Sequence, residues 1–169
     1  TGADDYITKP FDLRELRMRV EAHLRRSVRD LSASPLTGLP GNPIIERVIA
    51  ARVQAREPLA VMYIDLTNFK VYNDEYGWIK GDQVIKFLAS TIVTAVTEWG
   101  TTLDFVGHVG GDDFVVASIP DRAAKIAQAV IDRFDAAIPE FYSDEARTRG
   151  YSVAKDSRGR SFRAQIATV

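Results

Sequence analysis

The chain has 169 residues, 46% of them hydrophobic and 27% charged, with a formal net charge of −1. These values predict a soluble globular chain of one domain plus an attached segment, and they argue against a nucleic-acid partner. The absence of cysteine excludes disulfides, thiolate metal sites and thiol catalysis. No apolar run approaches the roughly 20 residues of a membrane span. Because the first residue is Thr1 rather than Met, we expect a fragment of a longer chain.

The first predicted elements are a short strand at Tyr6-Ile7-Thr8 and a helix that begins after Asp12. Asp12 with Glu15 three residues later forms a capping box. Apolar residues then recur at helical spacing, namely Leu13, Leu16, Val20, Leu24, Val28 and Leu31. This face would either pair with a second copy as a dimer stalk or cover a sheet outside this chain, and the residues leave both possibilities open.

The middle of the chain alternates helix and strand signals. Asn42 as a cap, with Pro43 after it, predicts a helix to about residue 56. Residues 59–64 then read as a buried strand that ends at Asp65. A long helix follows at residues 83–98, with an apolar face formed by Val84, Ile85, Leu88, Ile92, Val93 and Val96.

Two neighbouring carboxylates, Asp112 and Asp113, follow the glycine pair Gly110-Gly111 between strand-forming runs at residues 103–109 and 114–119. A glycine pair permits the positive φ values of a tight hairpin turn, so we expect both carboxylates at the tip. Adjacent carboxylates repel each other unless a cation lies between them, and hard oxygen ligands suit Mg²⁺ with bound phosphates. Together with Asp65, the hairpin predicts a metal site.

The remaining third of the chain is predicted to contain a helix, a two-stranded excursion and a final strand. Asp121 would cap the helix, whose buried face is formed by Ile126, Val130, Ile131 and Phe134. Residues 151–154 before Asp156-Ser157-Arg158-Gly159 read as the excursion, and the sequence indicates no function for it. Residues 166–169 have the composition of a central strand.

Three motifs in order resemble the GGDEF family of diguanylate cyclases, over residues 36–169. They are Thr37-Gly38-Leu39-Pro40, then Asp65-x-x-x-Phe69-Lys70-x-x-Asn73-Asp74-x-x-Gly77-x-x-x-Gly81-Asp82, then Gly110-Gly111-Asp112-Asp113-Phe114. The resemblance implies an α+β fold of the nucleotide-cyclase or polymerase-palm type, with a central, mainly antiparallel sheet flanked by helices. An N-terminal helical stalk would precede it.

The resemblance implies an enzyme that condenses two GTP molecules into cyclic di-GMP with Mg²⁺ or Mn²⁺. Asp65, Asp112 and the main-chain carbonyl of Leu66 would bind the metal, and Asp112 with Asp113 would be catalytic. Substrate-binding residues would be Phe69, Lys70, Asn73, Asp82, Gly110 and Gly111. Asn73 and Asp82 would read guanine, because a carboxylate accepts from the N1 and N2 donors that adenine lacks. Two copies would have to meet as a homodimer, in the cytoplasm.

Several residues also have simpler interpretations. Asn73, Asp74 and Asp82 lie near glycines and could be turn or cap residues. His108 could be a metal ligand, although a lone histidine on a strand is more often packed. The chain departs from the family pattern at four positions: Asp113 is one methylene shorter than the usual Glu, and Thr67, Trp78 and His108 replace Asp, His and Arg. A catalytically silent GTP-binding module that regulates a partner is therefore the alternative function.

The N-terminal segment resembles the last strand and helix of a response-regulator receiver domain, over Gly2-Ala3-Asp4-Asp5-Tyr6-Ile7-Thr8-Lys9-Pro10-Phe11. In that family the lysine before the proline, here Lys9, contacts a phosphoryl group on a distant aspartate, which this chain lacks. We therefore expect a receiver-domain end at residues 1–26, a linker at 27–35 and the GGDEF domain at 36–169. A receiver domain and a sensor kinase would be partners, and no phosphorylation site can be named.

Overall fold

The computed structural model describes residues 5–155 and 160–169. Its elements are α1 (Leu13–Ser32), α2 (Asn42–Gln54), β1 (Ala60–Ile64), α3 (Phe69–Tyr76), α4 (Trp78–Trp99), β2 (Phe105–Gly110), β3 (Asp113–Ser118), α5 (Pro120–Ala137), the 3-10 helix η1 (Ile138–Phe141), α6 (Asp144–Arg149), β4 (Tyr151–Lys155) and β5 (Ser161–Gln165). Predictions that rest on Gly2–Asp4, on 156–159 or on the side chains of Leu24, Val28 and Leu31 lie outside the described residues.

The main sheet has the strand order β1-β3-β2, and both pairings are antiparallel. Ile64 pairs with Phe114, and Phe114 pairs on its other side with His108. This register brings the C-terminal end of β1 beside the tip of the β2–β3 hairpin. The predicted α+β fold with an antiparallel sheet is thereby confirmed, and the two acidic motifs meet at one end of the sheet.

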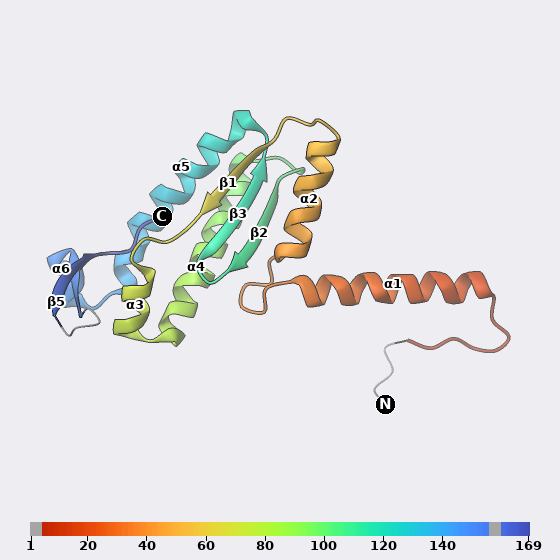
Figure 1. Ribbon diagram of the computed structural model, residues 1–169, viewed down its shortest axis with the longest axis horizontal. Coiled ribbons are helices and arrows are strands. Elements are labelled where there is room, and N and C mark those ends of the chain that lie inside the picture. The colour runs from red at the N-terminus through yellow and green to blue at the C-terminus, as the bar shows by residue number, and fades with distance from the viewer. Residues whose placement is uncertain (1–4, 156–159) are drawn as a thin grey trace.

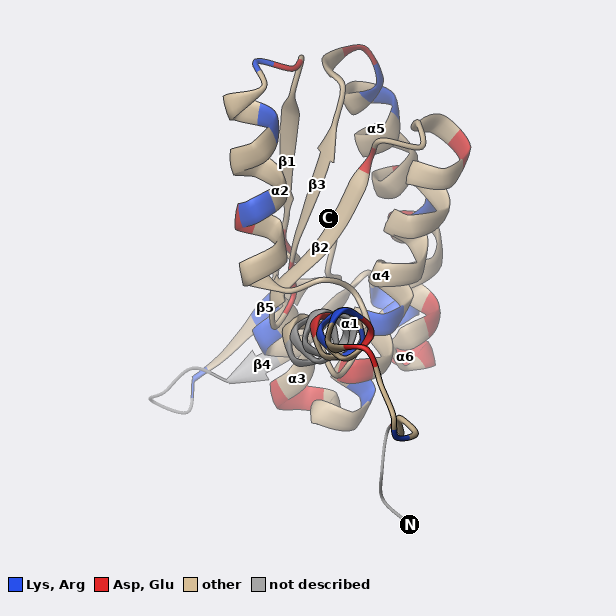
Figure 2. Cartoon of the chain, turned by 90° about the vertical axis from the view of Figure 1, so that its right-hand side faces the viewer, with Lys and Arg blue, Asp and Glu red and all other residues tan. Residues whose placement is uncertain are grey.

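Helices cover both faces of this sheet. α2 lies against one face, and α4 and α5 lie against the other (Figures 1 and 2). The core between the sheet and the α4–α5 pair includes fully buried residues from all three elements, among them Val84, Leu88, Ile92, Phe114, Val116, Ile126, Val130 and Phe134. The predicted apolar faces of the two long helices are therefore confirmed for these positions, whereas Val93, predicted on the same face, is 40% exposed.

Helix α1 extends away from the rest of the fold (Figure 1). Its N-cap is Asp12, whose side chain accepts a hydrogen bond from the main-chain N–H of Arg14 at 2.6 Å, so the predicted start is confirmed. Residues 6–8 do not form the predicted strand. A strand needs a hydrogen-bonded neighbour, and the described part of the chain places none beside them. No helix among the described residues is long and apolar enough to span a bilayer.

The helical content between β1 and β2 was underestimated from the sequence. Residues 69–76 form α3, which no pattern predicted, and α4 begins at Trp78 rather than at residue 83. Asn73, Asp74 and Asp82 near glycines were compatible with turn or cap positions, but they lie within two helices. Gly77, with a φ of 84°, is the single residue between these helices. The residues that would read guanine therefore project from helices.

Three smaller predictions were wrong. Gly41 and not Asn42 occupies the N-cap of α2, and Asp121 lies in the first turn of α5, behind the cap residue Ile119. In both cases proline stands at the start of the helix and fixes the boundary. Residues 166–169 are not a strand, although the Thr168 carbonyl accepts from the N–H of Thr67 at 3.0 Å. The excursion near residue 151 is confirmed as the β4–β5 hairpin.

Candidate nucleotide site

A cavity of about 740 Å³ opens at the end of the sheet where the acidic motifs meet. It lies between α3, the first turns of α4, the tip of the β2–β3 hairpin and the turn that follows α1. Its lining combines apolar, amide, ammonium and carboxylate groups: Ser34, Pro35, Leu36, Leu66, Asn68, Phe69, Lys70, Asn73, Asp74, Trp78, Gly81, Asp82, Ile85, His108, Gly110, Gly111 and Asp112. Of the ten predicted site residues, Asp65 and Asp113 are outside this lining.

Asp112 is the carboxylate at the hairpin end of the cavity. Burial raises its pKa, and the negative charges of Asp65 and Asp113 raise it further. Its carboxylate accepts hydrogen bonds from its own N–H and from the N–H of Leu66, which act in the opposite direction on its pKa. Asp65, Leu66, Asp112 and Asp113 are thus neighbours, and the mutual repulsion of the three carboxylates suits an added cation.

The protein could supply only part of a metal coordination sphere. In residues 5–155 and 160–169, no three His, Asp or Glu side chains are grouped as metal ligands. The carboxylates of Asp65 and Asp112 are close enough to interact electrostatically, so each offers oxygen donors at this end of the sheet. Mg²⁺ usually keeps several waters and takes further oxygens from substrate phosphates, so this sparse set of donors fits Mg²⁺ with a nucleotide.

The turn of the hairpin differs from the predicted Gly-Gly turn. Gly110 is the last residue of β2 and pairs with Asp113, so the turn residues are Gly111 and Asp112. The register shifts between His108 and Gly110, and Gly111 has a φ of 58°. An irregularity of this kind re-aims side chains at a strand end. It places Asp112 in the cavity and leaves Asp113 at the start of β3.

Asp113 faces the phenol of Tyr63. Tyr63 donates a hydrogen bond to the Asp113 carboxylate, which is the largest cause of the raised pKa of the phenol, followed by burial and by the charges of Asp113, Asp65 and Asp112. Tyr63 pairs with Val115, two residues after Asp113, so both side chains lie on one face of the sheet. No sequence signal other than this alternation could have indicated the contact.

Helix α3 carries three of the predicted substrate-binding residues, Phe69, Lys70 and Asn73. Asn68 caps the helix in the left-handed conformation, with a φ of 59°. Phe69 is buried in the core and also lines the cavity, whereas Lys70 is exposed at the cavity wall. Asn73 is one helical turn further on and is 8% exposed. Along one face of α3, the cavity wall therefore changes from the ammonium group of Lys70 to the amide group of Asn73.

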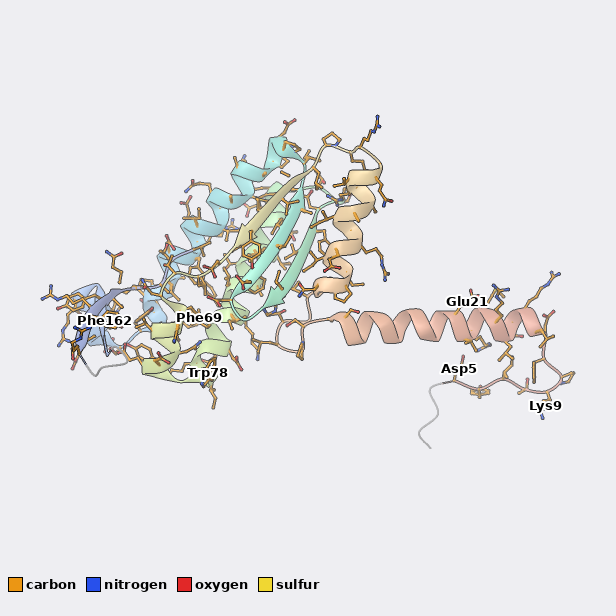
Figure 3. The ribbon with its side chains drawn as sticks, in the orientation of Figure 1. Asp5, Lys9, Glu21, Phe69, Trp78 and Phe162 are labelled. Carbon is orange, nitrogen blue, oxygen red and sulfur yellow. The ribbon has the colours of Figure 1, made fainter. Side chains whose placement is uncertain are left out.

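The Asn73 side chain is buried, and its Oδ1 has no hydrogen-bond partner. Helix α4 approaches closely here, because a Cβ at Gly81 would lie 1.8 Å from this oxygen. Asp82, the next residue, is exposed and lines the same cavity, as does Trp78. Figure 3 shows Trp78 projecting away from the sheet at the outer end of the α3–α4 pair. A buried unpaired carbonyl oxygen beside a carboxylate favours a ligand rich in N–H donors.

His108 is packed, as the simpler interpretation predicted. It is 4% exposed, stacks on Phe114 with ring centroids 4.4 Å apart, and has hydrogen-bond partners at both ring nitrogens. The sequence reasoning missed that residues 34–36, just after α1, form a wall of the cavity. Lys9 lies at the opposite end of α1, far from this site (Figure 3).

The sequence profile of the family described as "Diguanylate cyclase, GGDEF domain" matches residues 33–155. The chain therefore belongs to the GGDEF-domain family. Diguanylate cyclase DgcP of Pseudomonas aeruginosa is 29% identical over 121 residues, which are 69% of this chain and 17% of that protein. Response regulator PleD of Caulobacter vibrioides is 26% identical over 149 residues, which are 78% of this chain and 32% of that protein.

A crystal structure of a sensory box/GGDEF family protein from Caulobacter crescentus has the same fold. It is similar to this chain with a TM-score of 0.50 and 27% sequence identity, over 80% of this chain and 79% of that one. The curated relatives are much longer, and the chain spans between 17% and 32% of DgcP and PleD. What is shared is thus the GGDEF domain and not the whole of either relative.

Proposed function

We propose that this domain binds GTP with Mg²⁺ or Mn²⁺ and that two copies condense two GTP molecules into cyclic di-GMP. The observation that carries the proposal is that the two ends of the cavity described above carry different polar groups. Its hairpin end is lined by Asp112, whose carboxylate Asp65 and Asp113 repel. Its helical end is lined by Asp82 and by Asn73, whose Oδ1 is unpaired. A purine nucleotide has matching groups at its two ends.

At the phosphate end, Asp65, Asp112 and the carbonyl of Leu66 would hold the metal. Lys70 would contact the phosphates as a point charge, and the main chain at Gly110 and Gly111 allows close approach because these residues have no side chain. Phosphoryl-type transfer depends on positioning and charge neutralisation more than on covalent participation by the protein. A bound divalent ion supplies Lewis-acid polarisation of the α-phosphate.

At the base end, Asp82 would accept from guanine N1 and N2, and Asn73 would accept through Oδ1 and donate through its amide to ring acceptors. Adenine lacks this donor pair, so ATP would leave the Asp82 carboxylate and Asn73 Oδ1 without the N1 and N2 donors that guanine supplies. The unpaired Asn73 oxygen is buried, and leaving such a group without a partner costs on the order of 1–3 kcal/mol. Guanine selectivity follows from these two residues.

Each domain would hold one GTP, so catalysis needs a homodimer with the two sites face to face. The 3′-oxygen of one nucleotide forms a bond to the α-phosphorus of the other, the bond to pyrophosphate breaks, and the 3′-hydroxyl proton is lost. Asp112, with Asp113 behind it, is our candidate for assisting that proton loss. Helix α1 would set how the copies meet, downstream of a receiver domain and a sensor kinase, in the cytoplasm.

A silent GTP-binding module is a second candidate, because two of the departures from the family pattern have other partners. The Asp113 carboxylate accepts from Tyr63, and the Thr67 hydroxyl donates to the Thr168 carbonyl at 3.1 Å. Both groups are thereby engaged within the chain. Such a module would bind GTP and regulate a partner without turnover.

Product analysis on the full-length protein separates these candidates. Incubation with GTP and Mg²⁺ should give cyclic di-GMP and pyrophosphate by chromatography, and Asp112→Asn should give neither. Bound GTP without cyclic product in a dimeric full-length protein would favour the silent module. Absence of GTP binding would refute both candidates.

A further inference from the structure

His108 connects two segments that are far apart in the sequence and that both line the cavity. Its Nδ1 lies 2.7 Å from Ser34 Oγ and 3.0 Å from Thr37 Oγ1. Its Nε2 lies 3.0 Å from the carbonyl oxygen of Gly111. We call residues 33–41, which follow α1, the N-terminal turn. One buried imidazole therefore bridges the N-terminal turn and the tip of the β2–β3 hairpin.

The N-terminal turn is also fixed by main-chain bonds. The N–H of His108 donates to the Pro40 carbonyl at 2.8 Å, and the N–H of Gly41 donates to the Ser32 carbonyl at 2.6 Å. Ser32 is the last residue of α1. The end of α1 is thus held to the N-terminal turn, and the turn is held to β2 at the residue whose ring reaches the hairpin.

The hydrogen-bond partners also fix the tautomer of His108. A carbonyl oxygen only accepts, so Nε2 must carry the hydrogen that is donated to Gly111. In the neutral ring Nδ1 then accepts from a hydroxyl of Ser34 or Thr37. The ring lies flat on Phe114, with 9° between the two planes, so it cannot reorient without losing this stack. The bridge is therefore rigid and directional.

We propose that His108 is a positioning residue, which fixes Gly111, and Asp112 after it, relative to the N-terminal turn at the end of α1. Its effect on ligand affinity rests on the proposed function, whereas its effect on the hairpin does not. Gly111 has a positive φ and no atom within 4 Å of its missing side chain, so packing alone does not hold the turn. The bond from His108 supplies that restraint.

The bridge has two arms, the bond from Nε2 to Gly111 and the bonds between Nδ1 and the hydroxyls of Ser34 and Thr37, and two substitutions separate them. His108→Gln places an amide donor near the Nε2 position and keeps the bond to Gly111, whereas His108→Asn is too short to reach it. By calorimetry on the full-length protein with GTP and Mg²⁺, we expect His108→Asn to weaken binding by roughly tenfold and His108→Gln by less than about threefold. Equal affinities for the two folded variants would overturn the proposal.

Thr37→Val tests the other arm from outside the cavity, because Thr37 is not among the lining residues. We expect a loss of roughly threefold in the parent protein and no further loss in the His108→Gln background, where the link to Thr37 is already broken. Thr97→Val is the matched control, since its hydroxyl bonds within α4 to the Val93 carbonyl at 2.7 Å. Additive losses in the double variant would contradict the bridge.

A measurement without nucleotide keeps this inference separate from the proposed function. In ¹⁵N spectra of the ligand-free full-length protein, Thr37→Val should shift the amide signals of Gly111 and Asp112, and Thr97→Val should not. If the parent binds no GTP, the proposed function fails, but these signals still decide the bridge. If the His108 variants do not fold, the Thr37→Val spectrum decides it alone, and unchanged hairpin signals would overturn the proposal.

Discussion

The two β-hairpins of this domain differ in regularity. In the β4–β5 hairpin the pairing runs from Tyr151–Gln165 to Lys155–Ser161 without a shift, and Val153 and Phe162 are about half exposed. In the β2–β3 hairpin the register shifts before the turn, and β3 is buried along most of its length. Regular pairing suffices where strands only need to associate. A register shift is needed where the tip must aim a carboxylate.

The difference extends to what holds each hairpin. The β2–β3 strands bury Phe114 and Val116 completely, and this burial stabilises a tip whose carboxylates repel each other. The β4–β5 pair buries the small residues Ser152 and Ala164, and the Arg163 guanidinium lies 4.8 Å from the centroid of the Tyr151 ring. Substitutions at the first tip should therefore affect ligand binding, and substitutions in the second hairpin should affect stability only.

The largest expected effect comes from removing either proposed metal-binding carboxylate. Asp112→Asn or Asp65→Asn should reduce Mg²⁺-dependent GTP affinity by about 100-fold or more, roughly 2.7 kcal/mol, because each removes a charged oxygen ligand. Calorimetric titration with and without Mg²⁺ measures this. Asp132→Asn, at an exposed position of α5, is the control. Unchanged affinity in both site variants would refute the metal assignment.

Base selectivity should depend on α3 and α4 and on neither hairpin. Asp82→Ala should weaken GTP by about ten- to a hundredfold, or 1.5–3 kcal/mol, and ATP by much less, because it deletes the acceptor for guanine N1 and N2. Competition binding with the two nucleotides checks the ratio. An equal loss for GTP and ATP would mean that Asp82 has a structural role.

A variant of Asp113, at the same hairpin tip, distinguishes an active enzyme from a silent binding module. If its shorter carboxylate serves the reaction, Asp113→Glu should change the rate of cyclic di-GMP formation by less than about tenfold, or roughly 1.4 kcal/mol of barrier. Chromatographic time courses on the full-length protein measure the rate. A parent protein without product whose Asp113→Glu variant forms product would instead identify Asp113 as the silencing change.

The two hairpins also offer a matched glycine pair. Gly111 has a φ of 58° and Gly150, just before β4, has a φ of 74°, and neither has an atom within 4 Å of its missing side chain. Substitution of either by Ala should cost about 1 kcal/mol of unfolding free energy, because L-residues are strained in this region. Only Gly111→Ala should also weaken Mg²⁺–GTP. Urea unfolding and calorimetry together test this, and an equal ligand effect would remove the distinction between the hairpins.

The sequence predicted the elements whose signals are local. The strand before Asp65, the hairpin at Gly110-Gly111 and the buried face with Ile126 follow from residue order, because alternation and helical period are short-range patterns. The start of α4 was missed because glycine and polar residues, which usually mark loops, here lie between two abutting helices.

Contacts between distant segments could not be predicted in the same way. Ser34 and Thr37 reach His108 across 74 and 71 residues, and no local pattern encodes that meeting. The proximity of Asp65 to the hairpin was predicted because a buried strand and a hairpin share one sheet. The cavity wall at residues 34–36 depends on how the N-terminal turn packs on β2, which only the three-dimensional structure contains.

The smallest expected effect is a gain in stability at the tip of the β2–β3 hairpin. Burial and the charges of Asp65 and Asp113 raise the pKa of Asp112 in the folded state. A raised pKa means that its protonated form is favoured by folding, so its stabilising contribution is present at low pH and is lost as the pH rises through that value. Without metal, ionised Asp112 therefore destabilises the native domain at neutral pH.

Asp112→Asn should accordingly raise the unfolding temperature of the metal-free protein at pH 8 by roughly 1–2 °C, or about 0.5 kcal/mol after allowance for solvent screening of this half-buried group. The gain should shrink towards zero near pH 3, where the parent carboxyl is protonated in both states. Thermal unfolding across this pH range measures it, with Asp132→Asn as control. A gain that does not vary with pH would exclude the charge of Asp112 as its cause. Saturating GTP and Mg²⁺ should reverse the order, because only the parent then binds the ligand and is stabilised by it.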